Sequence, residues 1–245
     1  MKFNEIDGII FDKDGTLMKF QSFWLPVTYR VISKLCNEYE LNVVIKKECI
    51  NALGIDENDC IDPEGQLAIG TYATISTSLR NVLLRHEKSV QNSQLQKKIT
   101  QWFEEESEKQ TCHFTTDLKQ LCDCLQKKNI HIAVATTDNL EVTQRCLKQG
   151  EMNVEVISAS DSSIPKKPDT SLIQYLAEIW NTTCEKIVMI GDTPNDLRFA
   201  KKAGAKTIGV LSGVSNEQLL LPYADCILNN RLIYNRVVDK WLIYA

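Results

Sequence analysis

The sequence of 245 residues lacks the features that mark several large classes of protein. It has no internal repeat, no low-complexity segment and no apolar run long enough to span a membrane. Its net charge is −4 and its basic residues are interspersed with acidic ones, so the composition does not indicate a nucleic-acid binder. The first residues are one early lysine and then acids around a short apolar run, which is not the pattern of a signal peptide. We therefore expect a cytoplasmic protein that acts on a small molecule.

Cysteine and histidine patterns typical of metal sites are absent as well. The nine cysteines are scattered and include no C-x-x-C pair, and Cys122 and Cys124 have poor spacing for two zinc ligands on a helix. The three histidines share no spacing that would make a metal site or a catalytic dyad. We expect the cysteines to be reduced thiols, most of them buried.

What the sequence does contain is a group of polar residues directly after its first apolar run. Ile9 to Phe11 predict a buried strand, and Asp12 to Thr16 follow it with two carboxylates, a glycine and a hydroxyl. Because ligands bind beyond the carboxyl ends of parallel strands, Asp12 and Asp14 would lie at the active edge of a sheet. Gly15 would allow a sharp turn. An Asp-Gly pair taken alone is more commonly a surface turn with incidental acids.

Two parts of the chain differ in their periodicity. Residues 19–111 show helical spacing of apolar residues and no long β-rich run, whereas the sequence after Thr115 alternates between helix and strand patterns. The acids at the end of the helical part predict a solvated helix end without function; they are Glu104, Glu105, Glu106 and Glu108. We expect an α/β fold, a doubly wound parallel sheet formed by residues 1–18 and 112–245, with an inserted all-helical domain of residues 19–111.

The second part predicts a series of strands and covering helices. Asn139 is expected to cap a helix that stops at Gly150, and a helix starting at Pro194 is expected to close at Gly204. A last helix is expected from about Arg231. The predicted strands are Ile132 to Ala135, Val154 to Ile157, Ile187 to Ile190, Thr207 to Val210 and a short one at Asp225 to Leu228.

Polar groups follow four of these strands and together suit phosphoryl transfer. Carboxylates such as Asp192 attract Mg²⁺, which takes oxygen ligands and coordinates a substrate phosphate, and a lysine adds positive charge. Each residue also has a structural explanation: Thr193, Pro194 and Asp196 resemble the start of a helix, and a Lys-Lys-Pro loop is usually a solvated turn. The groups in order are Asp12, Asp14 and Thr16, then Thr136, then Lys166 and Lys167, then Asp192 and Asp196.

In this order the residues resemble the motifs of the haloacid dehalogenase superfamily, in particular its phosphoglycolate-phosphatase-like branch. The first motif, Asp-x-Asp-Gly-Thr, is matched by Asp12 to Thr16, and the fourth, Gly-Asp-x-x-x-Asp, by Gly191 to Asp196. The second, a Ser or Thr, is matched by Thr136, with Thr137 as the neighbouring alternative. The third is a lysine commonly followed by proline, which favours Lys167 over Lys166. The helical insertion stands where that branch carries its helical cap domain.

The resemblance implies a reaction and a role for each residue. Asp12 would attack phosphorus to form an aspartyl-phosphate, and Asp14 would act as acid and then as base. Mg²⁺ would be held by the Asp12 carboxylate, the Asp14 backbone carbonyl and Asp192. The other roles implied are phosphoryl binding by Thr136 and Lys167, support by Asp196, Gly15 and Thr16, and closure of the site by the cap domain.

Substrate and activity stay open at this level. The expected function is hydrolysis of a small phosphate monoester, either a phosphoglycolate-like acid or a sugar phosphate; Lys19 and Arg80 are candidates for binding a substrate carboxylate. Met18 to Phe20 depart from the acid and serine that many relatives have there, which affects only the inference of substrate. A phosphomutase of the same superfamily would share every core residue, whereas a dehalogenase would not need Asp14. A non-catalytic phosphate-binding or signalling protein is the alternative from another class. The sequence does not indicate an oligomeric state.

Overall fold

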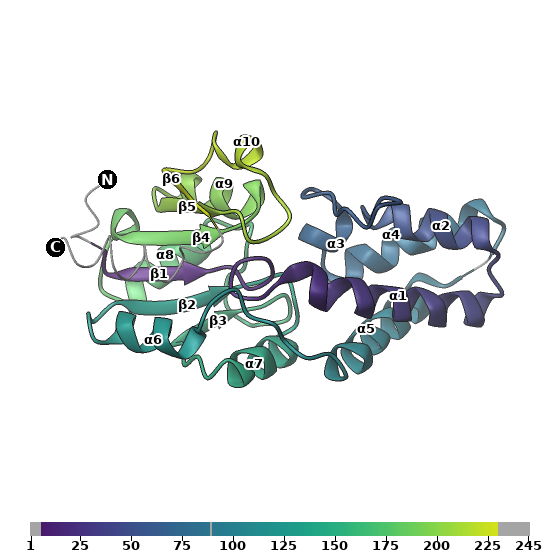
Figure 1. The fold of residues 1–245 in the computed structure, drawn as a ribbon, viewed down its shortest axis with the longest axis horizontal. Helices are drawn as coiled ribbons and strands as arrows, with labels where there is room; N and C mark the ends of the chain where they lie inside the picture. The colour runs from purple at the N-terminus through teal and green to yellow at the C-terminus, as the bar shows by residue number, and fades with distance from the viewer. Residues whose placement is uncertain (1–5, 89, 230–245) are drawn as a thin grey trace. The chain divides into compact units, whose positions relative to one another are not determined.

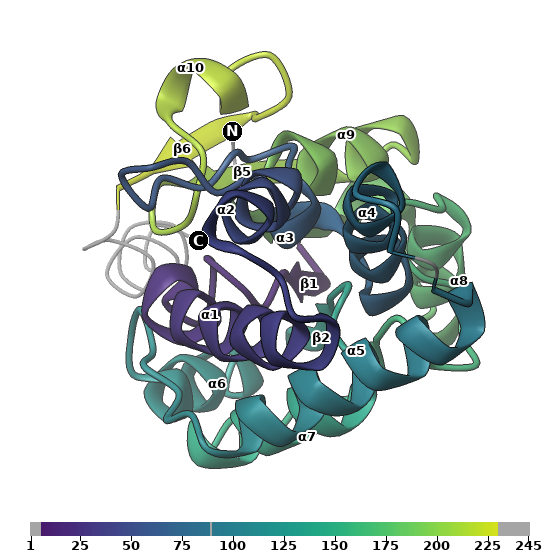
Figure 2. The ribbon, with the colours of Figure 1, turned by 90° about the vertical axis from the view of Figure 1, so that its right-hand side faces the viewer.

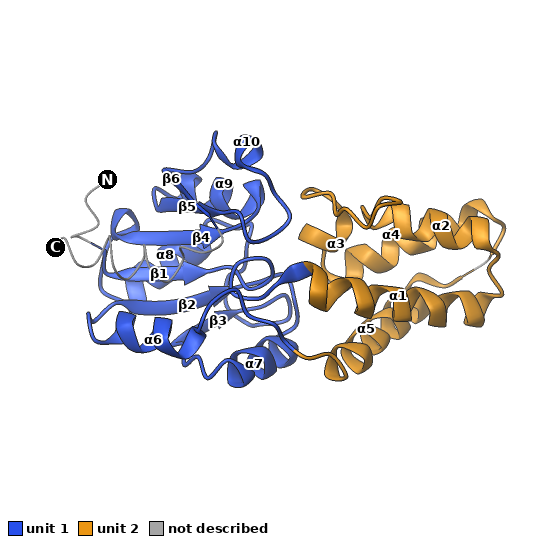
Figure 3. Cartoon of the chain, in the orientation of Figure 1, with its two compact units in different colours: residues 1–20, 112–245 blue, residues 21–111 orange. Residues whose placement is uncertain are grey.

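A computed structural model describes residues 6–88 and 90–229 of the chain. The chain divides into two compact units, coloured separately in Figure 3. One unit, here called the core unit, contains residues 1–20 and 112–245. The other, here called the helical unit, contains residues 21–111. The sequence therefore leaves the core unit after its first strand and returns to it about ninety residues later.

The core unit is built on a parallel sheet of six strands in the order β3-β2-β1-β4-β5-β6 (Figure 1). Its central strand, β1, pairs with β2 on one side and with β4 on the other, so the chain reverses its direction of winding at β1. The strands are β1 (Gly8–Phe11), β2 (His131–Ala135), β3 (Val156–Ser158), β4 (Ile187–Gly191), β5 (Lys206–Val210) and β6 (Cys226–Leu228).

Two separate apolar clusters cover the two faces of this sheet. Side chains alternate along each strand, so Phe11 of β1 packs on the side of α6, whereas Ile10 packs on the side of α8. This is the doubly wound α/β fold expected from the sequence. The helices of the core unit are α6 (Leu118–Gln126), α7 (Leu140–Gln149), α8 (Ser171–Ile179), α9 (Pro194–Lys202) and α10 (Glu217–Leu220), with a 3₁₀ turn at Cys184–Lys186.

The helices that lie between β1 and α6 are α1 (Phe20–Tyr39), α2 (Val43–Ala52), α3 (Gln66–Ile69), α4 (Tyr72–Arg85) and α5 (Asn92–Glu108). Helix α4 packs on both α2 and α5, and Figures 1 and 2 show α1 beside α5, where Arg30 binds Glu106. Tyr72 stacks on Phe103 at a centroid distance of 5.0 Å, which joins α4 to α5. The insertion is helical, as its periodicity predicts.

One local expectation needs correction and another lies outside the described residues. Asn139 stands at the N-cap of α7 but its side chain makes no capping bond; the Leu140 amide donates instead to Oδ1 of Asp161 at 2.8 Å. Asp161 lies 21 residues after Leu140, so the local sequence does not predict this contact. The helix expected from about Arg231 lies outside the described residues. Within residues 6–88 and 90–229, none of the helices combines the length and the apolar character that crossing a membrane requires.

Glu106 is a further correction, because it is not at a solvated helix end. Its side chain is buried and accepts from Arg30 at 2.8 Å, Lys34 at 2.9 Å and Lys109 at 2.7 Å. Burial disfavours the charge, but the three cations outweigh it and lower the pKa of Glu106 to about 2. Glu106 therefore ties α1 to the end of α5.

We predict that Glu106→Gln loosens the helical unit by about 1–3 kcal/mol, because three cations lose a buried charged acceptor. Hydrogen exchange of peptides from α1 and α5 should then be about 5- to 150-fold faster. Glu105→Gln is the matched control, since Glu105 is half exposed and contacts only Lys34 among these cations. Equal exchange rates in the two variants would show that Glu106 does not hold the helices together.

Candidate active site

Three buried carboxylates converge where β1 and β4 end. Asp12 follows β1, Asp192 follows β4, and Asp196 lies in the first turn of α9. One carboxylate oxygen from each lies within 4.8 Å of the others. The side chains meet because β1 and β4 are neighbours in register, Phe11 opposite Ile190. The parallel pairing thus brings together residues 180 positions apart in the chain.

Lys167 supplies a cation to this group from the loop after β3. Its Nζ donates to Asp196 Oδ1 at 2.6 Å and to Asp12 Oδ1 at 2.5 Å, and its side chain is only 8% exposed. Lys166, by contrast, is exposed and donates to the carbonyls of Ser160 and Ser162. The geometry therefore distinguishes the two lysines that the sequence left as alternatives, and it places Lys167 at the carboxylates.

Asp196 makes both kinds of contact that its sequence context suggested. Its Oδ2 accepts from the backbone amide and hydroxyl of Thr193, which closes a capping box at the start of α9, while Oδ1 faces Lys167. The side chain packs closely on Gly191, where an added Cβ would lie 2.4 Å from that of Asp196. The capping box thus holds one oxygen of the Asp196 carboxylate, and the ion pair with Lys167 holds the other.

Asp192 is enclosed by glycines and by the loop after β5. A Cβ on Gly213 would lie 1.8 Å from Oδ2 of Asp192, and Val214 donates its backbone N–H to the same oxygen at 2.9 Å. Gly15 adopts a positive φ of 92°, and a Cβ there would lie 2.4 Å from Asp192. The Thr16 hydroxyl lies 3.5 Å from Oδ1. Any larger residue at either glycine would displace this carboxylate.

Asp14 lies beside Thr136 rather than inside the group of three carboxylates. Thr136, after β2, places its hydroxyl 3.4 Å from Asp14 Oδ2. Lys13 holds the other carboxylate oxygen, Oδ1, at 2.7 Å and lies 3.1 Å from Asp138. Lys13 is buried, and the two acids outweigh the effect of its burial and raise its pKa above the usual value.

Lys13 and Asp138 position Asp14 and are not part of the four motifs. Lys13 stands at the variable position of the Asp-x-Asp motif, although a lysine between two carboxylates near a sheet edge is itself a signal of an ion pair. Asp138 gave no signal, because its partner lies 125 positions earlier in the chain. Together they fix the orientation of Asp14.

Burial and mutual repulsion raise the pKa values of the central carboxylates. For Asp12, burial and then the charges of Asp196 and Asp14 outweigh the attraction of Lys167 and raise the pKa to about 7. For Asp192, burial and the charges of Asp12 and Asp196 raise the pKa well above its ordinary value. The group therefore holds more negative charge than Lys167 alone balances.

The donor set fits a small divalent cation. Carboxylate oxygens from Asp12, Asp192 and Asp196 lie close enough to share one ion, and hard cations such as Mg²⁺ prefer oxygen ligands. The positive charge of such an ion would offset the repulsion that raises the pKa values of Asp12 and Asp192. Asp196 belongs to this group of oxygen donors in the structure, whereas the role expected for it was support of the metal site.

The two residues predicted to bind a substrate carboxylate lie in different surroundings. Lys19 is exposed, directly before α1, and its backbone N–H donates to the carbonyl of His113. Arg80 lies on α4 and its Nε donates to the carbonyl of Val90 at 3.1 Å. That bond gives Arg80 a structural task inside the helical unit.

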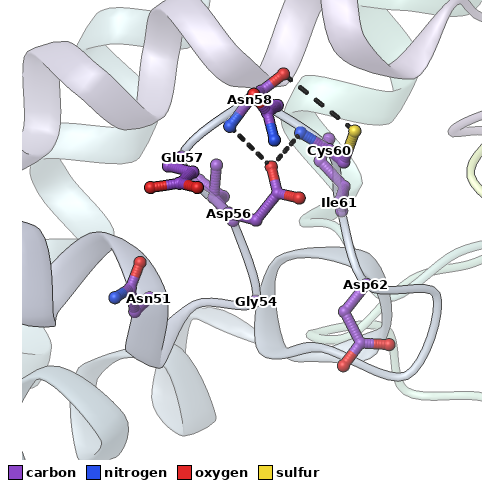
Figure 4. A pocket seen from close by; sticks show the side chains of 9 residues that line it. Asn51, Gly54, Asp56, Glu57, Asn58, Cys60, Ile61 and Asp62 are labelled. Carbon is purple, nitrogen blue, oxygen red and sulfur yellow. Dashed lines mark hydrogen bonds between the residues drawn. The ribbon is translucent and has the colours of Figure 1, made fainter.

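The helical unit contains a hollow of about 630 Å³ beside the loop that follows α2 (Figure 4). Asp56 Oδ1 accepts from the backbone N–H groups of Asn58 and Cys60, and Asp62 Oδ1 accepts from that of Glu64. The hydroxyl of Tyr29 donates to Asp59. These acids shape their own loop, so we assign the hollow no ligand.

Comparison with known proteins agrees with this geometry. Phosphoglycolate phosphatase of Neisseria meningitidis is 33% identical over 98 residues, which are 39% of this chain and 42% of that protein. The chain spans about half the length of the first curated relatives that it matches.

Two solved structures share the fold at low sequence identity. One is a predicted phosphoglycolate phosphatase from Haemophilus somnus 129PT, with a TM-score of 0.67, 17% identity and coverage of 91% of this chain and 94% of that one. The other is assigned as a β-phosphoglucomutase from Thermotoga maritima, with a TM-score of 0.66, 18% identity and coverage of 95% and 98%.

The match to a protein family includes the ends of β1, β2, β3 and β4. Residues 6–204 match the model of the haloacid dehalogenase-like hydrolases, and this range contains the acids after β1 and β4, Thr136 and Lys167. The chain belongs to the haloacid dehalogenase-like hydrolase family.

Proposed function

We propose that this protein is a Mg²⁺-dependent phosphatase that hydrolyses a small phosphate monoester through an aspartyl-phosphate on Asp12. The observation that carries the proposal is the buried ion group in which Lys167 bridges Asp12 and Asp196 beside Asp192. Membership of the hydrolase family and similarity to phosphoglycolate phosphatases support it. The location in the cytoplasm expected from the sequence stays a prediction.

Asp12 is the nucleophile in this proposal. Its carboxylate attacks phosphorus and displaces the alcohol, which divides one difficult hydrolysis into two displacements. The backbone N–H of Asp12 donates to the Ile190 carbonyl at 2.8 Å, which fixes the residue at the end of β1. Attack requires the ionised form, so a pKa raised to about 7 must be counteracted by positive charge near Asp12.

Asp14 is the general acid and then the general base. It gives a proton to the departing alcohol oxygen and later takes one from the water that hydrolyses the aspartyl-phosphate. Lys13 and Thr136 each hold one of its carboxylate oxygens, so the side chain has a defined direction. Its side chain is 13% exposed, more than that of Asp12, which allows a proton to be exchanged with water.

Lys167 and Thr136 bind the oxygens of the transferring phosphoryl group. A buried ammonium stabilises the negative charge that the group carries in the transition state, and a hydroxyl donates one hydrogen bond to it. When bound, Mg²⁺ would neutralise further phosphate charge and orient the phosphate toward the nucleophile; Asp12, Asp192 and the Asp14 backbone carbonyl would hold it, with Asp196 beside them.

The substrate class is a phosphoglycolate-like acid or a sugar phosphate. The matched relatives named phosphoglycolate phosphatase favour the first. Binding of a substrate carboxylate by Lys19 and Arg80 stays a prediction, and the bond of Arg80 to Val90 favours a structural role for the arginine.

A phosphomutase is the second candidate, because a solved structure assigned as a β-phosphoglucomutase shares the fold. Both reactions need the same core residues. The decisive experiment is a panel of phosphate monoesters incubated with the protein and Mg²⁺, with Asp12→Asn as the inactive control. Release of free phosphate supports the phosphatase, isomerised sugar phosphate supports the mutase, and turnover by Asp12→Asn would refute the nucleophile.

Asp14→Asn should slow hydrolysis about 10²- to 10⁴-fold, because the amide cannot transfer a proton. The first displacement should suffer less with a nitrophenyl phosphate, whose leaving group needs no proton. Pre-steady-state release of nitrophenolate measures this step by itself. The same loss for nitrophenyl and alkyl phosphates would contradict the role of general acid.

The two adjacent lysines provide a matched pair of variants. Lys167→Ala should lower kcat/KM by about 10²- to 10³-fold, since it removes a charge at the phosphate from a buried site. Lys166→Ala should leave kcat/KM nearly unchanged, because Lys166 is exposed and binds only carbonyls. Steady-state kinetics with one substrate decides between them, and the opposite pattern would reject the assignment.

Mg²⁺ should stabilise the protein more at pH 7.5 than at pH 5.5. The folded pKa of Asp12 lies near 7, above its ordinary value of 3.8, so the metal-free fold binds the extra proton and loses stability as pH rises from about 4 to 7. Mg²⁺ at about 100 times its Kd should restore about 2.7 kcal/mol, seen as a rise in Tm. Asp192→Asn should abolish the rise and the exposed Asp169→Asn should keep it; an equal rise in both would place the ion elsewhere.

A further inference from the structure

Two of the nine free cysteines contact each other. Cys112 and Cys146 are 34 residues apart in sequence, yet their sulfur atoms lie 2.8 Å apart and both side chains are buried. A disulfide needs a separation of about 2.05 Å, so the two sulfurs are already close to bonding distance. Four cysteines are buried, four are half-buried and one is exposed, so the expectation that most are buried is wrong.

The pair lies where the chain returns to the core unit. Cys112 is the first residue after the helical unit, and its backbone N–H donates to Gln149 Oε1 at 3.3 Å. Cys146 lies one turn earlier than Gln149 on α7, so the backbone and the side chain of Cys112 contact one face of that helix.

The residues that follow Cys112 also contact the end of the turn that contains Asp12 to Thr16. Thr115 donates its backbone N–H to the Leu17 carbonyl and its hydroxyl to the Thr16 carbonyl at 2.6 Å, and Lys19 donates to His113. The second linker, residues 112–115, is therefore bound to the first linker, residues 17–19. A covalent bond at Cys112 would act on a segment joined to both.

The environment makes Cys112 the more reactive thiol. The hydrogen bond between Cys112 and Cys146, together with the nearby cation of Lys13, outweighs burial and lowers the pKa of Cys112, while the same contact and burial raise the pKa of Cys146. Cys36 and Cys49 form a different pair of neighbours: burial raises the pKa of both, that of Cys49 to about 12. The lowered pKa favours the thiolate of Cys112, which is the form that is oxidised, and the Cys146 sulfur lies 2.8 Å away.

We propose that Cys112 and Cys146 form a reversible disulfide on exposure to hydrogen peroxide, and that this bond fastens the second linker to α7. In the first step the Cys112 thiolate attacks one peroxide oxygen, the O–O bond breaks, and the released hydroxide takes a proton to become water. In the second, the Cys146 sulfur attacks the sulfenic sulfur, the S–O bond breaks, and the hydroxyl leaves as water with the Cys146 proton. Two thiols lose two electrons and the peroxide gains them.

The test is peptide mapping of the full-length folded protein after treatment with hydrogen peroxide. Remaining thiols are alkylated, the protein is digested without reductant, and cross-linked peptides are identified by mass spectrometry. We expect a Cys112–Cys146 peptide, a loss of two free thiols, and recovery of both with dithiothreitol. Alkylated Cys112 and Cys146 after peroxide, sulfinic acid at Cys112, or cross-links to other cysteines would overturn the proposal.

Variants separate this bond from general oxidation. Cys146→Ser should leave no cross-linked peptide and Cys112→Ser should behave alike, whereas Cys122→Ser should form the bond as the parent does. Cys122 is a matched control because it is buried on α6 and its thiol donates to the Asn153 carbonyl. Circular dichroism of each variant verifies the fold, and disulfide formation in Cys122→Ser alone among the three is the result we expect.

Hydrogen exchange measures the second half of the proposal. Backbone amides of residues 112–115 should exchange at least about 10-fold more slowly in the oxidised parent than in the reduced parent, and oxidation should not change them in Cys146→Ser. Unchanged exchange in a fully cross-linked sample would refute the fastening of the linker. Neither readout depends on phosphatase activity, so the proposal stands or fails separately from the proposed function.

Discussion

Repulsion between buried carboxylates is the constraint on which the core unit depends. Asp12, Asp192 and Asp196 lie together and are almost completely buried, and Lys167 places an ammonium within hydrogen-bond distance of two of them. Burial raises the free energy of each charged carboxylate, and repulsion from the neighbouring carboxylates raises it further. In the proposed function a bound cation would offset this repulsion, and the same charge would attract a phosphate.

The rest of the core unit keeps these charges in place. Parallel pairing of β1 with β4 brings Asp12 and Asp192 to one edge, and the capping box of α9 fixes Asp196. Gly15 and Gly213 permit the backbone to approach Asp192 more closely than any side chain would allow. The buried charges at the site therefore destabilise the fold, and the two apolar clusters that cover the sheet compensate for this loss of stability.

The sequence predicted the parts of this account that depend on local order. Strand periodicity located the polar turn after Phe11, and Gly191 to Asp196 marked both a helix start and an acidic motif. Contacts between residues distant in sequence were not predictable: Lys13 with Asp138, Leu140 with Asp161, and Glu106 with Arg30. A single sequence specifies which residues are polar, whereas tertiary packing decides which polar residue meets which, and Glu106 became a buried ion for that reason.

The central claim is that Asp12 carries a covalent phosphoryl group. The most direct measurement uses Asp14→Asn, in which a nitrophenyl phosphate can phosphorylate Asp12 while the base for hydrolysis is absent. The reaction is quenched in acid and the peptides are mapped by mass spectrometry. The account predicts a phosphoryl group on Asp12 that accumulates in proportion to the burst of nitrophenolate. A phosphoryl group on another residue, or nitrophenolate release without any phosphoprotein, would contradict it.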